Sequence, residues 1–192
     1  MYNIVAMTII WIISSFSFYV NNTFIKYVPG DFQVNALVMT SADVVGSLIP
    51  GLFNHHFSAK QLFFTFASIS AITLLLMMIF IDKDDHENWS TPVYVAIGRL
   101  GVVMSFTTLY LKHPTMFPTM FNVTSMGIAN FTARLFVIGA PIVAEMAYPD
   151  PVAIIFVLQI ICAITALFLK KGTSDIGKKN ESKNRNDRSR NV

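Results

Sequence analysis

Little charge and almost no cysteine mark this sequence. Only 13% of its 192 residues are charged, whereas 54% are hydrophobic, and the mean hydropathy is +0.56. A soluble domain of this size cannot bury so much apolar surface. The single cysteine, Cys162, lies inside an apolar stretch and excludes an intrachain disulfide. We therefore expect a protein that lies in a lipid bilayer.

The sequence also lacks the motifs of the common enzyme and nucleic-acid-binding classes. It has no glycine-rich phosphate loop, nucleophile elbow or zinc-ligand spacing, and no basic segment interleaved with aromatic residues. Acidic residues cluster around His86 in the segment 82–87, but without the ligand spacing of a metal site. We therefore expect no enzymatic activity, no cofactor, no metal and no nucleic-acid partner.

What the sequence does have is a series of apolar stretches of membrane-spanning length. An α-helix needs about 20 residues to cross a hydrocarbon core of about 30 Å, whereas spanning strands are shorter and alternate in polarity. The pattern predicts an all-α membrane protein with six transmembrane helices, at Ile4–Val20, Phe32–Phe53, Leu62–Ile81, Thr91–Leu111, Met126–Met146 and Val152–Leu169. Residues 1–170 would form one six-span bundle, and the polar residues 171–192 a disordered basic tail.

The distribution of charge predicts how the bundle is oriented. Residues 170–192 carry eight basic and three acidic side chains, and basic segments next to a span stay in the cytoplasm. With an even number of spans, both termini are then cytoplasmic. The segments Asn54–Gln61 and Lys112-His113 fall on the same side as inner loops, and the acidic segment 82–87 falls outside. The sequence does not determine which membrane holds the protein, although we expect the plasma membrane.

Polar residues divide the spans into two groups. The third and sixth spans contain no charge, whereas the second, fourth and fifth contain Asp43, Arg99 and Arg134, and the first contains several serines and Tyr19. A charge at membrane depth is costly unless it faces a partner or water. Spans one, two, four and five should therefore enclose a polar cavity near mid-depth, while spans three and six face lipid. Such a pattern indicates two three-helix repeats, as in transporters.

The junction of the fourth and fifth spans carries the motifs of a known family. Gly98-Arg99 precedes the loop Thr115–Asn122, and three residues follow Asn122 at offsets of five, twelve and nineteen: Gly127, Arg134 and Pro141. These residues and their spacing resemble the organic cation/anion transporter family of the major facilitator superfamily. The resemblance covers about residues 4–170. It implies helices seven to twelve, which form the C-terminal half of a twelve-helix transporter.

The sequence departs from the family pattern in its inner loops. Thr115 and Asn122 stand where the family loop has Glu and Arg, and Asn54-His55-His56 stands where the family has Gly-Arg-Arg. Two alternatives stay open. The chain is half of a working transporter, completed by a missing N-terminal half or by a second copy. Alternatively, it is a truncated, transport-incompetent protein that acts only by helix pairing with other membrane proteins.

The resemblance also implies substrate-binding residues, Arg134 above all, with Asp43, Tyr19 and Arg99, and the polarity of the fifth span adds Asn130. In the family, the position of Arg134 tends to be basic in anion carriers and acidic in cation carriers, so a small organic anion is the favoured substrate. A guanidinium group suits this role, because it stays charged and binds carboxylates through paired hydrogen bonds. Two other interpretations remain: an ion pair of Asp43 with Arg99 or Arg134, or a protonation site at Asp43.

Overall fold

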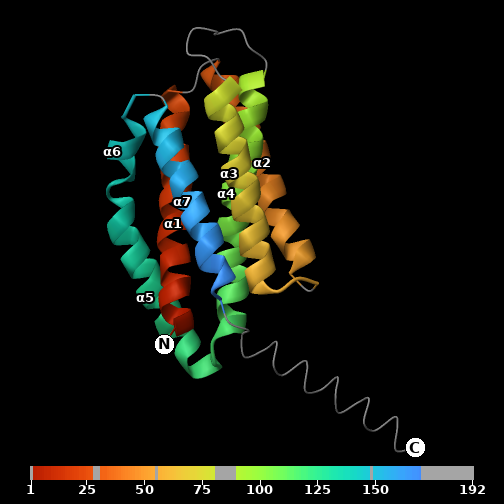
Figure 1. Cartoon of the computed structure of the whole chain (residues 1–192), viewed down its shortest axis with the longest axis vertical. Helices are drawn as coiled ribbons and strands as arrows, with labels where there is room; N and C mark the ends of the chain where they lie inside the picture. The colour runs from red at the N-terminus through yellow and green to blue at the C-terminus, as the bar shows by residue number, and fades with distance from the viewer. Residues whose placement is uncertain (1, 28–30, 55, 81–89, 148, 170–192) are drawn as a thin grey trace, which may run out of the picture.

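The computed structural model describes residues 2–27, 31–54, 56–80, 90–147 and 149–169. All regular elements in these ranges are helices: α1 (Tyr2–Phe24), the 3₁₀ turn η1 (Ile25–Tyr27), α2 (Phe32–Phe53), α3 (Ala59–Phe80), α4 (Ser90–Met116), α5 (Thr119–Val137), α6 (Ala140–Ala144) and α7 (Asp150–Leu167). They form an elongated bundle along one axis (Figure 1). The all-α prediction is therefore confirmed for the described part. The acidic segment 82–87 and the tail 171–192 lie outside it.

Among the described residues, four helical segments are long and apolar enough to cross a membrane: Asn3–Tyr27, α2, α3 and α7. They correspond to the first, second, third and sixth predicted spans. The helices α4 and α5, which carry the other two predicted spans, hold Arg99 and Arg134 and are more polar. The predicted ends of the second span, Phe32 and Phe53, match those of α2, which begins where the Asp31 side chain accepts a hydrogen bond from the Gln33 N–H at 2.8 Å.

The fifth predicted span is not one continuous helix. Instead of running from Met126 to Met146, α5 begins earlier, at Thr119, and ends at Val137, and the short α6 follows. The cause is Pro141, in the first turn of α6. Proline has no N–H to donate to the carbonyl of Val137, and its ring collides with that carbonyl, which disfavours a continuous helix through this position.

The helices pack in a reciprocal pattern around α1 and α4. These two helices contact each other, and they run antiparallel, since Trp11 meets His113 at one end and Asn22 meets Arg99 further along. The helix α2 packs on α4, and α5 packs on α1. In the same way α3 packs on α4, α7 packs on α1, and α3 and α7 pack on each other. The contacts of α2 and α3 with α4 thus correspond to the contacts of α5 and α7 with α1.

Small residues let α4 approach its neighbours closely. A Cβ atom at Gly101 would lie 2.7 Å from Cβ of Ser70 and 2.9 Å from its Cα, so the backbones of α3 and α4 nearly touch there. A Cβ atom at Gly46 would lie 3.1 Å from a methyl carbon of Val103, which shows close packing of α2 on α4. The spacing Gly98-x-x-Gly101 therefore serves helix packing at its second glycine.

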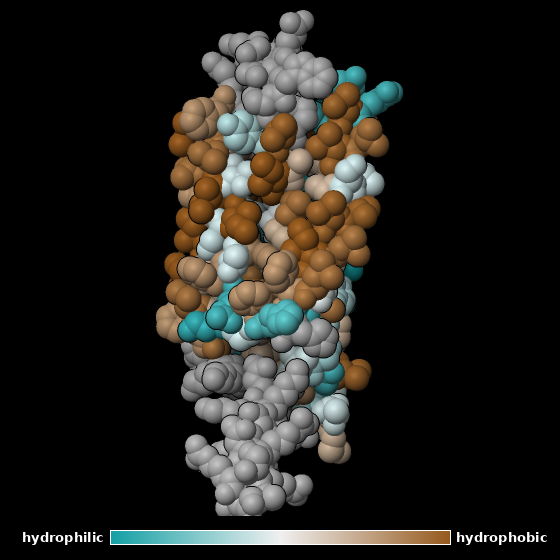
Figure 2. Space-filling model, turned by 90° about the vertical axis from the view of Figure 1, so that its right-hand side faces the viewer, coloured by the Kyte–Doolittle hydropathy of each residue, from teal (hydrophilic) through white to brown (hydrophobic). Residues whose placement is uncertain are grey.

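The outer sides of α3 and α7 are apolar, as expected for helices that face lipid. Beyond the first turns of these helices, their exposed large side chains are hydrophobic: Phe64, Ile69, Ile72, Leu75, Leu76, Ile79 and Phe80 on α3, and Val157, Ile160, Ile161, Ile164 and Leu167 on α7. Figure 2 shows one side of the molecule, which is apolar along most of its height and has hydrophilic residues gathered near its ends.

Candidate functional site

A buried ion pair joins α4 to α2. Nε of Arg99 donates to Oδ1 of Asp43 at 2.6 Å, and Nη2 donates to Oδ2 of the same carboxylate at 2.9 Å. This is the two-pronged geometry in which arginine binds a carboxylate most strongly. Arg99 is 1% exposed, whereas Asp43 is half-buried beside the face of α2 that packs on α4.

Two further acceptors on α1 complete the environment of Arg99. Nη1 donates to the backbone carbonyl of Phe18 at 3.1 Å, and Nη2 donates to Oδ1 of Asn22 at 2.7 Å. The guanidinium carbon also lies 4.2 Å from the centroid of the Phe18 ring, within range of a cation–π interaction. Arg99 is thus neutralised by α2 and hydrogen-bonded by α1 and α2, so its charge is already compensated within the bundle.

Arg134 lies on the exposed side of α5 in a different setting. Its Nη1 donates a hydrogen bond to the hydroxyl oxygen of Tyr19 on α1, and its guanidinium carbon lies 5.3 Å from the centroid of that ring. Within the described part of the chain, the ion pair that forms joins Asp43 to Arg99, so Arg134 has no carboxylate partner there. A tyrosine hydroxyl orients the guanidinium but leaves its positive charge uncompensated.

The predicted site residues therefore form two groups rather than one. Asp43 pairs with Arg99, and Tyr19 pairs with Arg134. The groups meet at α1, where the rings of Phe18 and Tyr19 lie 5.6 Å apart between centroids and nearly perpendicular. Asn130 is half-buried and lies one helical turn before Arg134 on α5.

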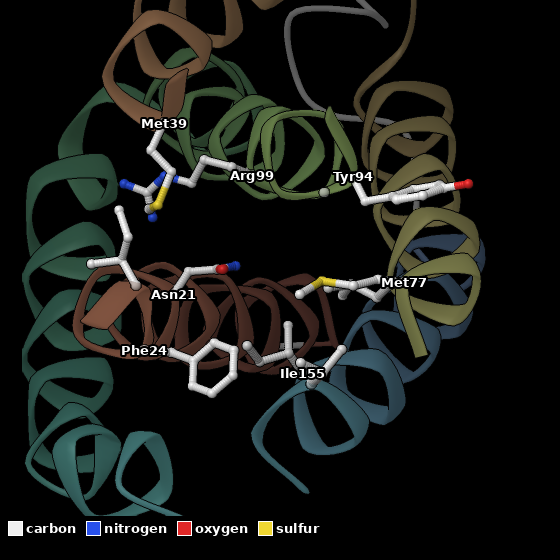
Figure 3. Close-up of a pocket in the computed structure, with 11 residues that line it drawn as sticks. Asn21, Phe24, Met39, Met77, Tyr94, Arg99 and Ile155 are labelled. Atoms are coloured by element: carbon white, nitrogen blue, oxygen red, sulfur yellow. The ribbon is translucent and has the colours of Figure 1, made fainter. Parts of the chain in front are cut away.

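A small pocket lies beside Arg99, inside the bundle. Figure 3 shows Arg99 and Met39 on one side of the hollow and Asn21 across it. The cavity volume is about 10 Å³, which is room for about one water molecule. The amide nitrogen of Asn21 is buried and has no hydrogen-bond partner among the described residues. The lining includes Arg99 but not Asp43, Tyr19, Arg134 or Asn130. The prediction that these residues share one interior cavity does not hold for this pocket, which is too small for an organic ion.

The serines of α1 lie inside the bundle. Ser14, Ser15 and Ser17 have exposed fractions of 0%, 4% and 0%. The reason is that α1 is a central helix with α4, α5, α6 and α7 packed around it. Its serines therefore belong to the interior of the bundle, and Tyr19 is the α1 residue that reaches Arg134.

Lys112 and His113 correct another prediction, because they belong to α4 rather than to a loop and are buried at 7% and 1% exposure. Nζ of Lys112 donates to the carbonyl oxygens of Asn54 at 2.7 Å and Phe57 at 2.8 Å. These carbonyls, at the end of α2 and in the following segment, take the place of water around the buried ammonium group. Lys112 thereby fixes the connection between α2 and α3.

A hydrogen-bond network around His113 was not predicted from the sequence. Nε1 of Trp11 donates to Nδ1 of His113 at 3.1 Å, and Nε2 of His113 lies 3.0 Å from Oγ of Ser125. An indole N–H can only donate, so Nδ1 carries no proton and Nε2–H is the donor to Ser125. Ser125 then donates to the carbonyl of Asn122 at 3.0 Å. The network joins α1, α4 and α5 at the end of the bundle opposite Arg99.

Replacing His113 with leucine should lower the free energy of unfolding by about 1–3 kcal/mol, because the buried Trp11 N–H loses its acceptor. Denaturant unfolding in detergent, followed by helical circular dichroism, measures this change. The double variant Trp11→Phe/His113→Leu removes donor and acceptor together and should recover part of the loss. A double variant as unstable as the sum of both single variants would contradict the coupling.

Distant relatives of the chain are found among named transporters. No family model matches the chain. The chain is 23% identical over 162 residues to a Drosophila melanogaster protein named organic cation transporter protein; the match covers 83% of this chain and 29% of that protein. It is 20% identical over 168 residues to mouse (Mus musculus) solute carrier family 22 member 21. This match covers 86% of this chain and 29% of the mouse protein.

The apolar helices and these distant relatives together identify the chain as an integral membrane protein related to transporters. Both relatives are named as carriers rather than enzymes, in agreement with the absence of enzyme motifs from the sequence. The chain spans less than a third of the length of either relative.

Proposed function

We propose that the chain is one helical half of a secondary transporter of small organic ions. The reciprocal packing of α1–α3 and α4–α7 supports this proposal, because transporter halves are often built from two three-helix repeats. In this proposal α5 and α6 together form the fifth of six spans, and the arrangement is half of a major facilitator superfamily fold. Both termini are cytoplasmic, and the plasma membrane is the expected location.

The substrate contact is Arg134, supported by Tyr19 and with Asn130 on the same helix. One observation carries this assignment: Asp43 is engaged by Arg99, so the guanidinium of Arg134 keeps its charge on an exposed face. An uncompensated arginine attracts carboxylates and sulfonates and repels organic cations. We therefore favour an organic anion as substrate, although one of the distant relatives is named as a cation transporter.

The exposed face around Arg134 needs a second bundle to become a cavity. The helices α2 and α5 each pack mainly on one neighbour, and both leave a side uncovered. A missing N-terminal half, or a second copy of this chain, would close that side and bury Arg134 between the halves. Alternating access would follow from rocking of one half against the other around this residue.

The experiment is uptake into proteoliposomes that hold this chain together with the rest of a transporter, using one fluorescent organic anion and one fluorescent organic cation. Saturable anion uptake above that of empty liposomes supports the proposal. If neither probe is taken up while the chain still assembles with membrane partners, the chain acts by helix pairing and the transport proposal is wrong.

A further inference from the structure

An apolar pocket with basic neighbours lies between the end of α2 and the start of α3. It has a volume of about 200 Å³, and its lining is mostly aromatic and aliphatic: Phe53, Phe57, Gln61, Leu62, Thr65 and Phe66. The ring centroids of Phe53 and Phe57 lie 5.8 Å apart, and each of these residues is 44% exposed. This pocket belongs to neither group of candidate site residues and lies on helices other than those that hold Arg134.

The pocket is held in shape by hydrogen bonds of the connecting loop. Lys112 binds the carbonyl oxygens of Asn54 and Phe57, at the two ends of the loop. Ser58 donates to Oε1 of Gln61 from its backbone N–H at 3.1 Å and from its hydroxyl at 3.0 Å, which caps the first turn of α3. These hydrogen bonds hold the described residues at the edge of the pocket in place.

The ionisable residues next to the pocket in sequence are basic. His56 and Lys60 are exposed and stand next in sequence to the lining residues Phe57 and Gln61. The sequence has no acidic residue between Asp43 and Asp82. In Figure 2, the hydrophilic residues near the lower end of the described part lie directly below an apolar surface. An apolar pocket beside an ammonium group at the end of a membrane helix matches a molecule with an acyl chain and an anionic headgroup.

We propose that this pocket binds an anionic glycerophospholipid, with an acyl chain among the phenylalanines and the headgroup phosphate at Lys60 and His56. The predicted orientation places the loop on the cytoplasmic side, where anionic lipids are enriched and attract basic side chains. Since the membrane surrounds the bundle, lipid is the ligand present at this depth. The inference rests on membrane insertion and does not require the transport function.

The test uses nanodiscs of phosphatidylcholine that contain the full chain and a trace of photoactivatable lipid, either phosphatidylglycerol or phosphatidylcholine. Cross-linked peptides are then mapped by mass spectrometry. We expect labelling within residues 53–66 to be about fivefold stronger with phosphatidylglycerol, the factor that one lysine near an anionic surface provides. Thr65→Phe should fill the pocket and reduce labelling by both lipids, and Lys60→Gln should remove the preference for phosphatidylglycerol.

Two matched variants serve as controls, both at exposed positions away from the pocket. Ile72→Phe adds an aromatic ring elsewhere on α3, and Lys26→Gln removes a cation from η1, so neither should change labelling of residues 53–66. Equal labelling by the two lipids, or labelling that persists in Thr65→Phe, would overturn the proposal and leave only bulk lipid at this surface. Cross-links between two protein chains at the pocket would overturn it in favour of a protein partner.

Discussion

The substitution Asp43→Leu is expected to lower the free energy of unfolding by about 3–5 kcal/mol. It leaves the guanidinium of Arg99 buried at 1% exposure without its counter-charge. The remaining acceptors, the carbonyl of Phe18 and the amide of Asn22, are neutral and cannot replace the carboxylate. Denaturant unfolding in detergent micelles, followed by helical circular dichroism, measures the loss.

A double variant shows whether the effect belongs to the ion pair. Asp43→Leu/Arg99→Met removes both charges and should recover most of the stability, because replacing a buried pair with apolar residues is often neutral. Asp31→Asn is the matched control, since it also removes one carboxylate from α2 but at the exposed cap, and should cost about 1 kcal/mol or less. If the double variant is no more stable than Asp43→Leu, the pair does not hold the helices together.

The substitution Arg134→Asp is expected to reduce uptake of an organic anion at least about tenfold in the complete transporter. A hydrogen bond to a charged group contributes about 1.5–3 kcal/mol, and each 1.4 kcal/mol corresponds to about a tenfold change in binding. The reversed charge also repels the substrate, so the loss should exceed that of Arg134→Lys, which keeps the charge but not the paired donors. Cation uptake should rise in Arg134→Asp.

A second charge reversal shows whether the effect of Arg134→Asp arises at the site or from the change in the net charge of the protein. Lys26→Asp makes the same change in net charge at an exposed residue of η1, and it should leave anion uptake within about twofold, because solvent screens distant charges. Tyr19→Phe keeps the ring beside Arg134 but loses the hydroxyl, and should have a smaller effect than Arg134→Asp. Unchanged anion uptake in Arg134→Asp would show that Arg134 has only a structural role.

Much of the fold could be predicted from local features of the sequence. Runs of apolar residues predict the helices, and the boundaries of α2 agree to the residue because the Asp31 cap marks its start. The sequence also indicated an ion pair at Asp43, because a charge at membrane depth requires a partner. Its partner could not be chosen between Arg99 and Arg134, since that depends on how α4 and α5 are rotated about their axes.

Features that depend on packing between distant residues could not be predicted. Asn22 binds Arg99 across 77 positions of sequence, and Trp11 binds His113 across 102. Both contacts follow from the antiparallel register of α1 and α4, which no local pattern encodes. The burial of Lys112 was missed for the same reason, because its acceptors lie on the α2–α3 connection. Pro141 was visible in the sequence, but its effect on α5 could not be predicted from it, because Pro50 and Pro114 lie inside α2 and α4 without ending them.

The central claim is that the face around Arg134 opens to water while α7 faces lipid. It is tested most directly by thiol accessibility of this chain assembled with the rest of a transporter, in a Cys162→Ala background that removes the buried native cysteine of this chain. Asn130→Cys and Arg134→Cys should react with a charged, membrane-impermeant thiosulfonate, because only a hydrated thiol ionises to the reactive thiolate. Ile161→Cys and Ile164→Cys on α7 should stay unmodified. Equal reactivity at the two helices, or reaction confined to α7, would contradict a water-filled cavity at Arg134.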